Sequence, residues 1–538
     1  MRKCKVLSIR ALGLQAALSF LAFSPVLSVA EDSVWETHLK AAVHYQELGN
    51  YAAAENACFA AVNEAEKFGP DDLRLATSLN NLALLYKIQA KYAEAEPIYQ
   101  RALGIVEKAL GPGHPSLASI LNNIADLDRS LGKYAEAEAL YQRALVIREA
   151  KLGRAHPEVA RSLNNLATLY FSRGQGAQAE PAFLRASAIL ESSVGPEHPE
   201  VAATLNNLAE LYRSQGKPRQ AELLYRRALA VWQKTFGSEH PDTAMCQNNL
   251  AVLYYEQGRY TEAEPLLLRA VEIREKVLKP GHPDLAASLN NLAALRLAQG
   301  QPGQAEILYR RVLSLQEKSL GPTHPAIAAT LYNLAELIRT QRVRHVSPEP
   351  LYRRALSIWE QSLGPDHADV AKGQDSLAEI YRLKGKFDKA ESLLRSSLAI
   401  REKALGAEHP DVAASLNNLG VFYYGRRQYA MAEPLFQRAL DIWEKAFGAE
   451  HQNVARGLRH LAEVYSAQDR HREAVASYQR VVSIQEKSPG TDNPELAATL
   501  NSWALLLRKT HRKAEAAELE ERARVVGGYK TPGQPPAK

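Results

Sequence analysis

Histidine is the residue of this sequence that most invites a metal-binding interpretation. Nine histidines recur at nearly constant spacing, one in about every 42 residues: His114, His156, His198, His240, His282, His324, His367, His409 and His451. A zinc site needs about four ligands that converge on one point. Because one histidine per interval spreads along the molecule instead, we expect these residues to cap loops and to hold no metal.

Catalytic chemistry has little support in the sequence. It contains no Gly-rich phosphate loop, no His-Glu-x-x-His and no nucleophile elbow. Carboxylates such as Glu94 and Glu96 recur with the same spacing as the histidines, which is typical of solvated helix faces. Cys58 and Cys246 lie several intervals apart, too far to bridge, so we expect two buried thiols. We therefore predict no enzyme, no cofactor and no metal.

The elements that position these residues are internal repeats. Leu79-Asn80-Asn81-Leu82-Ala83 returns 42 residues later as Leu121-Asn122-Asn123-Ile124-Ala125, and similar copies continue to Leu500. One step is 43 residues long, between Leu331 and Gln374. With a degenerate first copy around Ala42 and Tyr45, the pattern predicts twelve repeats.

Each repeat has the periodicity of two helices. Leu79, Leu82, Ala83 and Tyr86 follow the i, i+3, i+4, i+7 spacing of one apolar helix stripe. A second stripe follows a short break with glycine, and a Gly-Pro-x-His-Pro loop leads to the next repeat, with proline at the first helical position. Neither helix can bury its stripe alone, whereas stacked repeats can. The sequence predicts an all-α, right-handed superhelical α-solenoid of about twelve helix-turn-helix units.

The repeat resembles the tetratricopeptide repeat, in the 42-residue form of kinesin light chains and their bacterial relatives. With Leu82 at position seven of the family's unit, Ala83, Tyr86, Ala95, Tyr99 and Ala102 fall at positions where the family has small or aromatic residues. The resemblance covers about residues 40 to 525. It implies a concave groove lined by first helices that holds an extended peptide or a partner helix, and it leaves the partner open.

The resemblance places two asparagines of each first helix in different roles. The first, at position five, would point into the groove, where its amide could donate to and accept from a peptide backbone. The second, at position six, would bridge neighbouring helices; the alternative is that the first is structural as well. The first asparagines are Asn80, Asn122, Asn164, Asn206, Asn248, Asn290, Asn417 and Asn501.

Position twelve would also face the groove, and it holds cations and aromatic residues suited to a peptide with acidic and bulky side chains. These residues are Lys87, Arg129, Phe171, Arg213, Tyr255, Leu297, Arg339, Arg382 and Tyr424. An alternative stays open, because Glu210, Glu336 and Glu379 precede an arginine by three residues and could neutralise it. One interval is irregular: residues 339–352 lack the turn glycine, which indicates a bulged turn with a late-starting second helix or a specialised contact.

Three segments follow from composition. Residues 1–30 fit a cleavable secretory signal peptide, with four basic residues before an apolar stretch and Ser28-Val29-Ala30 before Glu31. The alternative is an uncleaved membrane anchor, which the polar residues and the proline within the apolar stretch disfavour. Residues 31–525 form the solenoid, and residues 526–538 are a Gly/Pro-rich tail that we expect to be disordered. The remaining charge is nearly balanced and lacks the clustered positive charge of a nucleic-acid site.

Together these features predict a periplasmic or secreted scaffold that binds a protein or peptide of unknown identity, with no nucleic acid and no membrane span after signal cleavage. A second hypothesis is a self-associating structural component of the cell envelope. Trp232, Trp359 and Trp443 share one position of the second helix. If they formed an exposed stripe, they would favour the second hypothesis.

Overall fold

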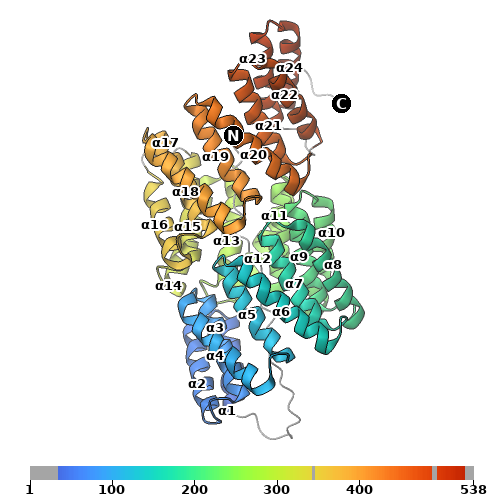
Figure 1. Cartoon of the computed structure of the whole chain (residues 1–538), viewed down its shortest axis with the longest axis vertical. Coiled ribbons are helices and arrows are strands. Elements are labelled where there is room, and N and C mark those ends of the chain that lie inside the picture. The colour runs from blue at the N-terminus through green and yellow to red at the C-terminus, as the bar shows by residue number, and fades with distance from the viewer. Residues whose placement is uncertain (1–33, 342–345, 488–493, 528–538) are drawn as a thin grey trace. The chain divides into compact units, whose positions relative to one another are not determined.

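The computed structural model describes residues 34–341, 346–487 and 494–527, and all of the regular structure in these ranges is helical (Figure 1). The 24 helices found there form twelve antiparallel pairs, as the repeat pattern predicts. The chain divides into two compact bodies. Of the described residues, those from 34 to 373 form the N-terminal body and those from 374 to 527 form the C-terminal body.

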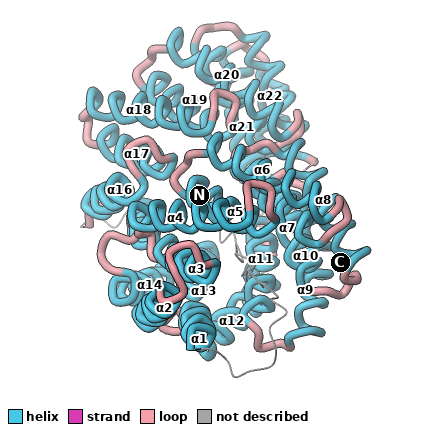
Figure 2. The backbone as a smooth tube through the Cα atoms, turned by 60° about the horizontal axis from the view of Figure 1, so that its bottom comes forward, coloured by secondary structure: helices cyan, strands magenta, loops and turns pink. Residues whose placement is uncertain are grey.

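The odd-numbered helices are the first helices of the repeats, and the even-numbered helices are the second (Figure 2). Their bounds are α1 Val34–Glu47, α2 Tyr51–Glu66, α3 Leu73–Ile88, α4 Tyr92–Leu110, α5 Pro115–Ser130, α6 Tyr134–Leu152, α7 Pro157–Ser172, α8 Gly176–Ser193, α9 Pro199–Ser214, α10 Pro218–Phe236, α11 Pro241–Glu256, α12 Tyr260–Val277, α13 Pro283–Ala298, α14 Pro302–Leu320, α15 Pro325–Gln341, α16 Glu349–Leu363, α17 Ala368–Leu383, α18 Phe387–Leu405, α19 Pro410–Gly425, α20 Tyr429–Phe447, α21 Gln452–Ala467, α22 His471–Glu486, α23 Pro494–Lys509 and α24 Lys513–Val526.

The junctions between helices show why the pattern is so regular. Gly132, between α5 and α6, has φ +75°, and Gly111, which ends α4, has φ +82°. These are left-handed conformations in which a side chain is strained, so glycine ends the helix there. Pro115 then opens α5 at a position where its missing N–H is not needed.

Within a repeat, a small residue on the first helix accommodates an aromatic residue on the second. The tightest case is Gly420 of α19, where an added Cβ would lie 2.7 Å from Cε1 of Phe436 in α20. In most other repeats alanine holds this place, as Ala83 does near Tyr99, and both are fully buried. The apolar core is shared between repeats: one cluster runs from Ala42 to Ile147 and another from Val159 to Val312.

The recurring carboxylates belong to the outer faces, as expected. An arginine of one second helix pairs with a glutamate of the preceding second helix, and both side chains are partly exposed to solvent. Such pairs are Arg143–Glu107, Arg185–Glu149, Arg227–Glu191 and Arg311–Glu275. Exposed pairs of this kind contribute about 0–1 kcal/mol each.

The irregular interval has the late-starting second helix that was predicted. α15 continues to Gln341, and α16 begins only at Glu349, after Pro348. Residues 342–345 lie outside the described ranges, as do residues 1–30, on which the signal-peptide prediction rests. Among the described helices, none is long and apolar enough to cross a membrane.

Candidate functional site

The first asparagines form a ladder with the second asparagines of the following repeats. Nδ2 of the second asparagine donates to Oδ1 of the first asparagine in the preceding repeat, 43 residues earlier. The bonds are Asn123–Asn80 at 2.8 Å, Asn207–Asn164 at 3.2 Å, Asn249–Asn206 at 3.1 Å and Asn291–Asn248 at 3.0 Å. Each bond joins two neighbouring first helices.

This arrangement differs from the roles expected of the two asparagines. The second asparagine bridges helices as predicted, but its partner is the first asparagine, which was expected to be free for a ligand. Most first asparagines are also buried: Asn80, Asn122, Asn206, Asn248, Asn290 and Asn417 are at most 6% exposed, while Asn164 is half-buried. The physical reason is that adjacent first helices approach closely enough for amides at positions five and six to meet.

The ladder has gaps, and they leave polar atoms without a partner. Oδ1 of Asn122, Oδ1 of Asn417, and both amide atoms of Asn290 are buried without a hydrogen bond. The residue 43 positions later, which is the donor elsewhere in the ladder, is His460 after Asn417. After Asn122 and Asn290 it is still an asparagine, so a change of residue type accounts for one of the three gaps. A buried polar group without a partner costs about 1–3 kcal/mol. These three residues are therefore where the first-helix face still has unused hydrogen-bonding capacity.

The cations at position twelve are neutralised within the chain, which supports the alternative interpretation of that row. Arg339 pairs with Glu336 at 2.5 Å and Arg382 with Glu379 at 2.6 Å, while Arg213 contacts both Glu210 and Glu256.

The same holds at the N-terminal end of the row, where Asp126 pairs with both Lys87 and Arg129. Burial and the nearby Arg129 charge lower the pKa of Lys87 to about 7. Tyr255 is half-buried, with its ring centroid 5.9 Å from that of Tyr260. The row thus offers a partner carboxylate–cation pairs rather than a run of unpaired positive charge.

The histidines cap helices, as predicted. In each of the nine, Nδ1 accepts a hydrogen bond from the backbone N–H two residues later, at 3.0 to 3.3 Å. Asp72 does the same for α3 at 2.8 Å. In the described part of the chain, no group of three histidine, cysteine or carboxylate side chains is placed to hold a metal ion. Cys58 and Cys246 are buried free thiols, and burial raises the pKa of both.

The tryptophans do not form an outer stripe. Trp232, Trp359 and Trp443 are 0%, 2% and 1% exposed. Trp359 and Trp443 lie against Gly373 and Gly457 on the first helix of the next repeat. The feature that would have favoured self-association is therefore absent from these three positions.

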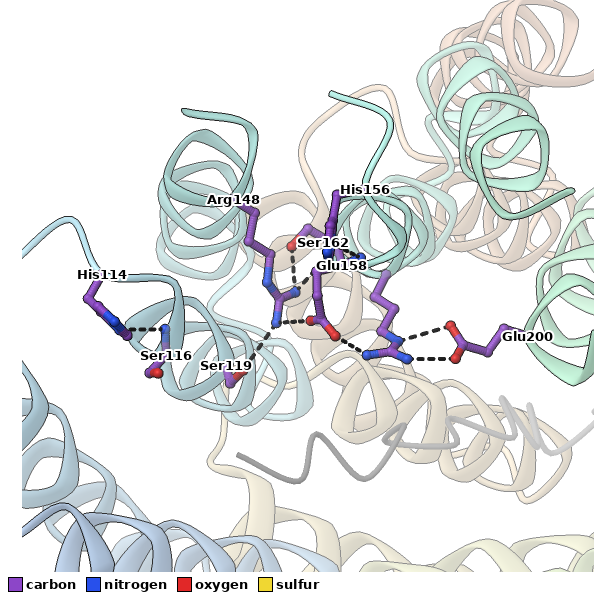
Figure 3. A network of polar contacts seen from close by, with 9 residues as sticks. His114, Ser116, Ser119, Arg148, His156, Glu158, Ser162 and Glu200 are labelled. Carbon is purple, nitrogen blue, oxygen red and sulfur yellow. Dashed lines mark hydrogen bonds and ion pairs between the residues drawn. The ribbon is translucent and has the colours of Figure 1, made fainter. Parts of the chain in front are cut away.

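The same second-helix position carries a buried arginine that sequence reasoning missed. Arg148 donates to the hydroxyls of Ser162 at 2.8 Å and Ser119 at 3.1 Å, and its guanidinium pairs with Glu158 at 2.8 Å (Figure 3). Arg161 then contacts Glu158 and reaches Glu200 of the following repeat at 2.6 Å. This polar network ties three consecutive repeats together.

A signal for these arginines was present in the sequence. The position holds Val106, Leu190 and Trp232 in other repeats, so a charge at Arg148, Arg274 or Arg401 stands out within an apolar column. Arg274 donates to Ser288 at 2.6 Å, and Arg401 pairs with Asp375 at 2.6 Å. Each arginine is accompanied by a serine 14 residues later, which a comparison among repeats could have found.

The fold and the repeated site define a helical-repeat protein, and comparison with known proteins identifies the family. A sequence model described as Tetratricopeptide repeat matches in overlapping stretches between residues 36 and 524: 36–108, 75–150, 116–192, 158–231, 224–276, 247–318, 284–342, 349–403, 371–427, 411–487 and 458–524. The chain belongs to the tetratricopeptide repeat family. No curated protein matches it.

Two solved structures have sequences similar to part of this chain. A putative kinesin light chain from Podosopora anserina with nearly identical TPR-like repeats is 32% identical. That match covers 38% of this chain and 98% of the other, with a TM-score of 0.33. BtubC (BKLC) from P. vanneervenii is 28% identical, over 44% of this chain and 92% of the other, with a TM-score of 0.36. The family model confirms the resemblance to the tetratricopeptide repeat.

Proposed function

We propose that this chain is an exported scaffold that holds a protein or an extended peptide along the faces of its first helices. The tetratricopeptide repeat fold supports a role in protein–protein interaction, and the repeat supplies one amide-bearing position per first helix. The observation that carries the proposal is the unmet hydrogen-bonding capacity of Asn290, whose two amide atoms could bind the N–H and C=O of a peptide backbone. Oδ1 of Asn122 is a third such atom.

The gaps in the ladder allow a sharper test than removing all first asparagines. Changing Asn122 and Asn290 to Ala removes amides with unmet atoms, so helix stability should be kept or raised, because alanine is the better helix former. If a partner's backbone binds there, about three hydrogen bonds are lost, or roughly 1.5–4.5 kcal/mol of affinity, about a ten- to thousandfold weakening.

The matched control changes Asn206 and Asn248, which accept ladder bonds from Asn249 and Asn291. That variant should unfold at lower denaturant concentration, because it leaves two buried amides without partners. The partner is first captured from envelope extract with the wild-type chain, and both variants are then titrated with it. Equal affinity of wild type and the Asn122/Asn290 variant would refute binding by these amides.

The second hypothesis, a self-associating envelope component, now has less support, because the three tryptophans are buried. Sedimentation of the purified chain across a wide concentration range separates the two. A monomer that binds its captured partner supports the scaffold, whereas reversible assembly with no captured partner supports the structural component.

A further inference from the structure

Within the N-terminal body, loops between late repeats contact turns within early repeats. The backbone N–H of Lys279 donates to the carbonyl of Leu48 at 2.9 Å. Nε2 of His324 lies 3.3 Å from the carbonyl oxygen of Ile88, which is 236 residues earlier in the chain. Figure 2 shows the corresponding helices, α2 and α3, beside α13 and α14. These contacts join parts of the body that no single pair of neighbouring repeats connects.

Two glycines mark the same boundary. An added Cβ at Gly49 would lie 2.9 Å from Cδ2 of His282, and one at Gly132 would lie 3.5 Å from Cδ2 of His367. The close approach at Gly49 leaves no room for a side chain. We call the boundary the seam: Leu48, Gly49, Ile88 and Gly132 on one side, and Lys279, His282, His324 and His367 on the other.

His324 shows why a histidine, and not only a capping oxygen, suits the seam. Its Nδ1 accepts from the N–H of Ala326 at 3.1 Å and so carries no proton, which leaves the proton of the neutral ring on Nε2. That N–H can donate to the carbonyl of Ile88. Aspartate caps α3 as well as histidine caps its helices, but it has no donor to place across the seam.

The seam accompanies a closed first-helix face. Ala294 is 2% exposed and lies one turn after Asn290 on the same face of α13. A partner cannot contact this row of first-helix residues while solvent does not reach it. The burial of the asparagines has a separate cause in the contact between neighbouring first helices, because Asn417 of the C-terminal body is only 6% exposed as well. The seam has two hydrogen bonds, the ring contacts and the packing of Leu320 against the apolar core of the early repeats. Adjacent repeats share far more interactions than this, so the seam can part while the repeats stay folded.

We propose that the seam is a latch that closes the first-helix face of the N-terminal body, and that it parts to admit a partner to the row of first-helix residues at Ala294. The idea that the latch admits a partner rests on the proposed function. The seam itself does not, because it can be measured without any partner. Breaking the seam should expose the face, whereas breaking a histidine cap elsewhere should not.

The test variant is His324→Asp, which keeps an oxygen to cap α15 and loses the Nε2 donor. The control is His198→Asp, because His198 caps α9 at 3.3 Å and is not part of the seam. The first measurement is amide hydrogen exchange of Lys279. We expect a protected amide in wild type and in the control, and exchange at least several-fold faster in His324→Asp, with the amides of α15 unchanged. A Lys279 amide that is unprotected in wild type would overturn the seam.

The second measurement reports access to the face. In full-length protein with Cys4, Cys58 and Cys246 changed to Ala, a cysteine is introduced by Ala294→Cys and its reaction with N-ethylmaleimide is timed. His324→Asp should accelerate the reaction several-fold, and His198→Asp should not. An Ala139→Cys reporter on the exposed side of α6 should react equally in all backgrounds.

The outcomes separate the two proposals. Faster exchange at Lys279 without faster labelling at residue 294 would show a seam that does not gate the face, and the latch would be rejected. A partner that binds wild type and the Asn122/Asn290 variant alike would reject the amide site while leaving the seam results standing.

Discussion

The ring of Trp359 lies against the backbone of Gly373, so that an added Cβ on the glycine would stand 3.3 Å from Cζ3 of the indole. The glycine is 14 residues later, on the first helix of the next repeat. Trp443 and Gly457 repeat the relationship at 3.4 Å. Where this second-helix position holds arginine, the residue 14 positions later is serine, as in Arg274–Ser288. Where it holds Gln316, that residue is Thr330, whose hydroxyl donates to Oε1 of Gln316 at 2.8 Å. The two positions are therefore matched in size and polarity at successive interfaces between repeats.

Overfilling one of these interfaces should destabilise the N-terminal body. Gly373→Leu adds a side chain where the tryptophan ring already lies, and overpacking of this kind costs about 1–3 kcal/mol. Urea unfolding of wild type and variant measures the change in free energy. The double variant Trp359→Arg with Gly373→Ser recreates the pairing of Arg148 with Ser162. It should be more stable than Gly373→Leu. A Leu variant as stable as wild type would mean that the close approach is not a constraint.

Removing the buried guanidinium of Arg148 should lower the free energy of unfolding more than removing an exposed guanidinium. Arg148→Ala leaves Ser119 and Ser162 without their donor and Glu158 without one partner. We expect a loss of about 2–3 kcal/mol, below the value for a fully buried pair because Glu158 is partly exposed. Arg143→Ala, in the exposed pair with Glu107, should change stability by less than about 1 kcal/mol. Denaturant titrations of both variants test the contrast.

The histidine caps should be replaceable by aspartate but not by alanine. His156→Ala removes the acceptor that binds the N–H of Glu158 at 3.1 Å, and loss of an N-cap costs about 1 kcal/mol. His156→Asp should be near neutral, because Asp72 caps α3 in the same way. Thermal melts with and without a zinc chelator complete the comparison. A large drop in Tm on chelation would contradict the capping role.

Acid should weaken the N-terminal body through its buried histidines. Burial lowers the pKa of both His282 and His324 below the usual value of 6.5. The unfolded chain therefore binds these protons more readily than the folded chain, and stability is lost as the pH falls below about 6.5. Unfolding free energies from pH 7.5 down to pH 5 should show this slope. His282→Asp with His324→Asp should reduce the slope, and an unchanged slope would assign it to other groups.

Export predicts a specific mature terminus. Removal of residues 1–30 should leave Glu31 as the first residue of the native protein, outside the cytoplasm. N-terminal sequencing of protein from fractionated cells measures this directly. An intact Met1 on cytoplasmic protein would contradict the proposed export.

Sequence alone determined the repeat length, the helix pairs, the capping histidines and the burial of the cysteines. These features depend on local spacing: apolar residues at helical intervals, glycine at turns, and proline after a capping residue. Because each repeat has the same helix and turn signals at the same spacing, twelve copies made the pattern clear. The match between Arg148 and Ser162 was also present in the sequence, but its meaning depends on knowing that residues 14 apart face each other.

Only the tertiary structure decided what the first asparagines and the tryptophans do. Helical periodicity places Asn80 on one face of its helix, but the distance between neighbouring first helices determines whether that amide meets Asn123 or a ligand. The seam is a stronger case. His324 and Ile88 are 236 residues apart, and their contact depends on small rotations from each repeat to the next that accumulate over the intervening helices. No local pattern encodes that sum, so the closing of the first-helix face could only be seen once the repeats were stacked.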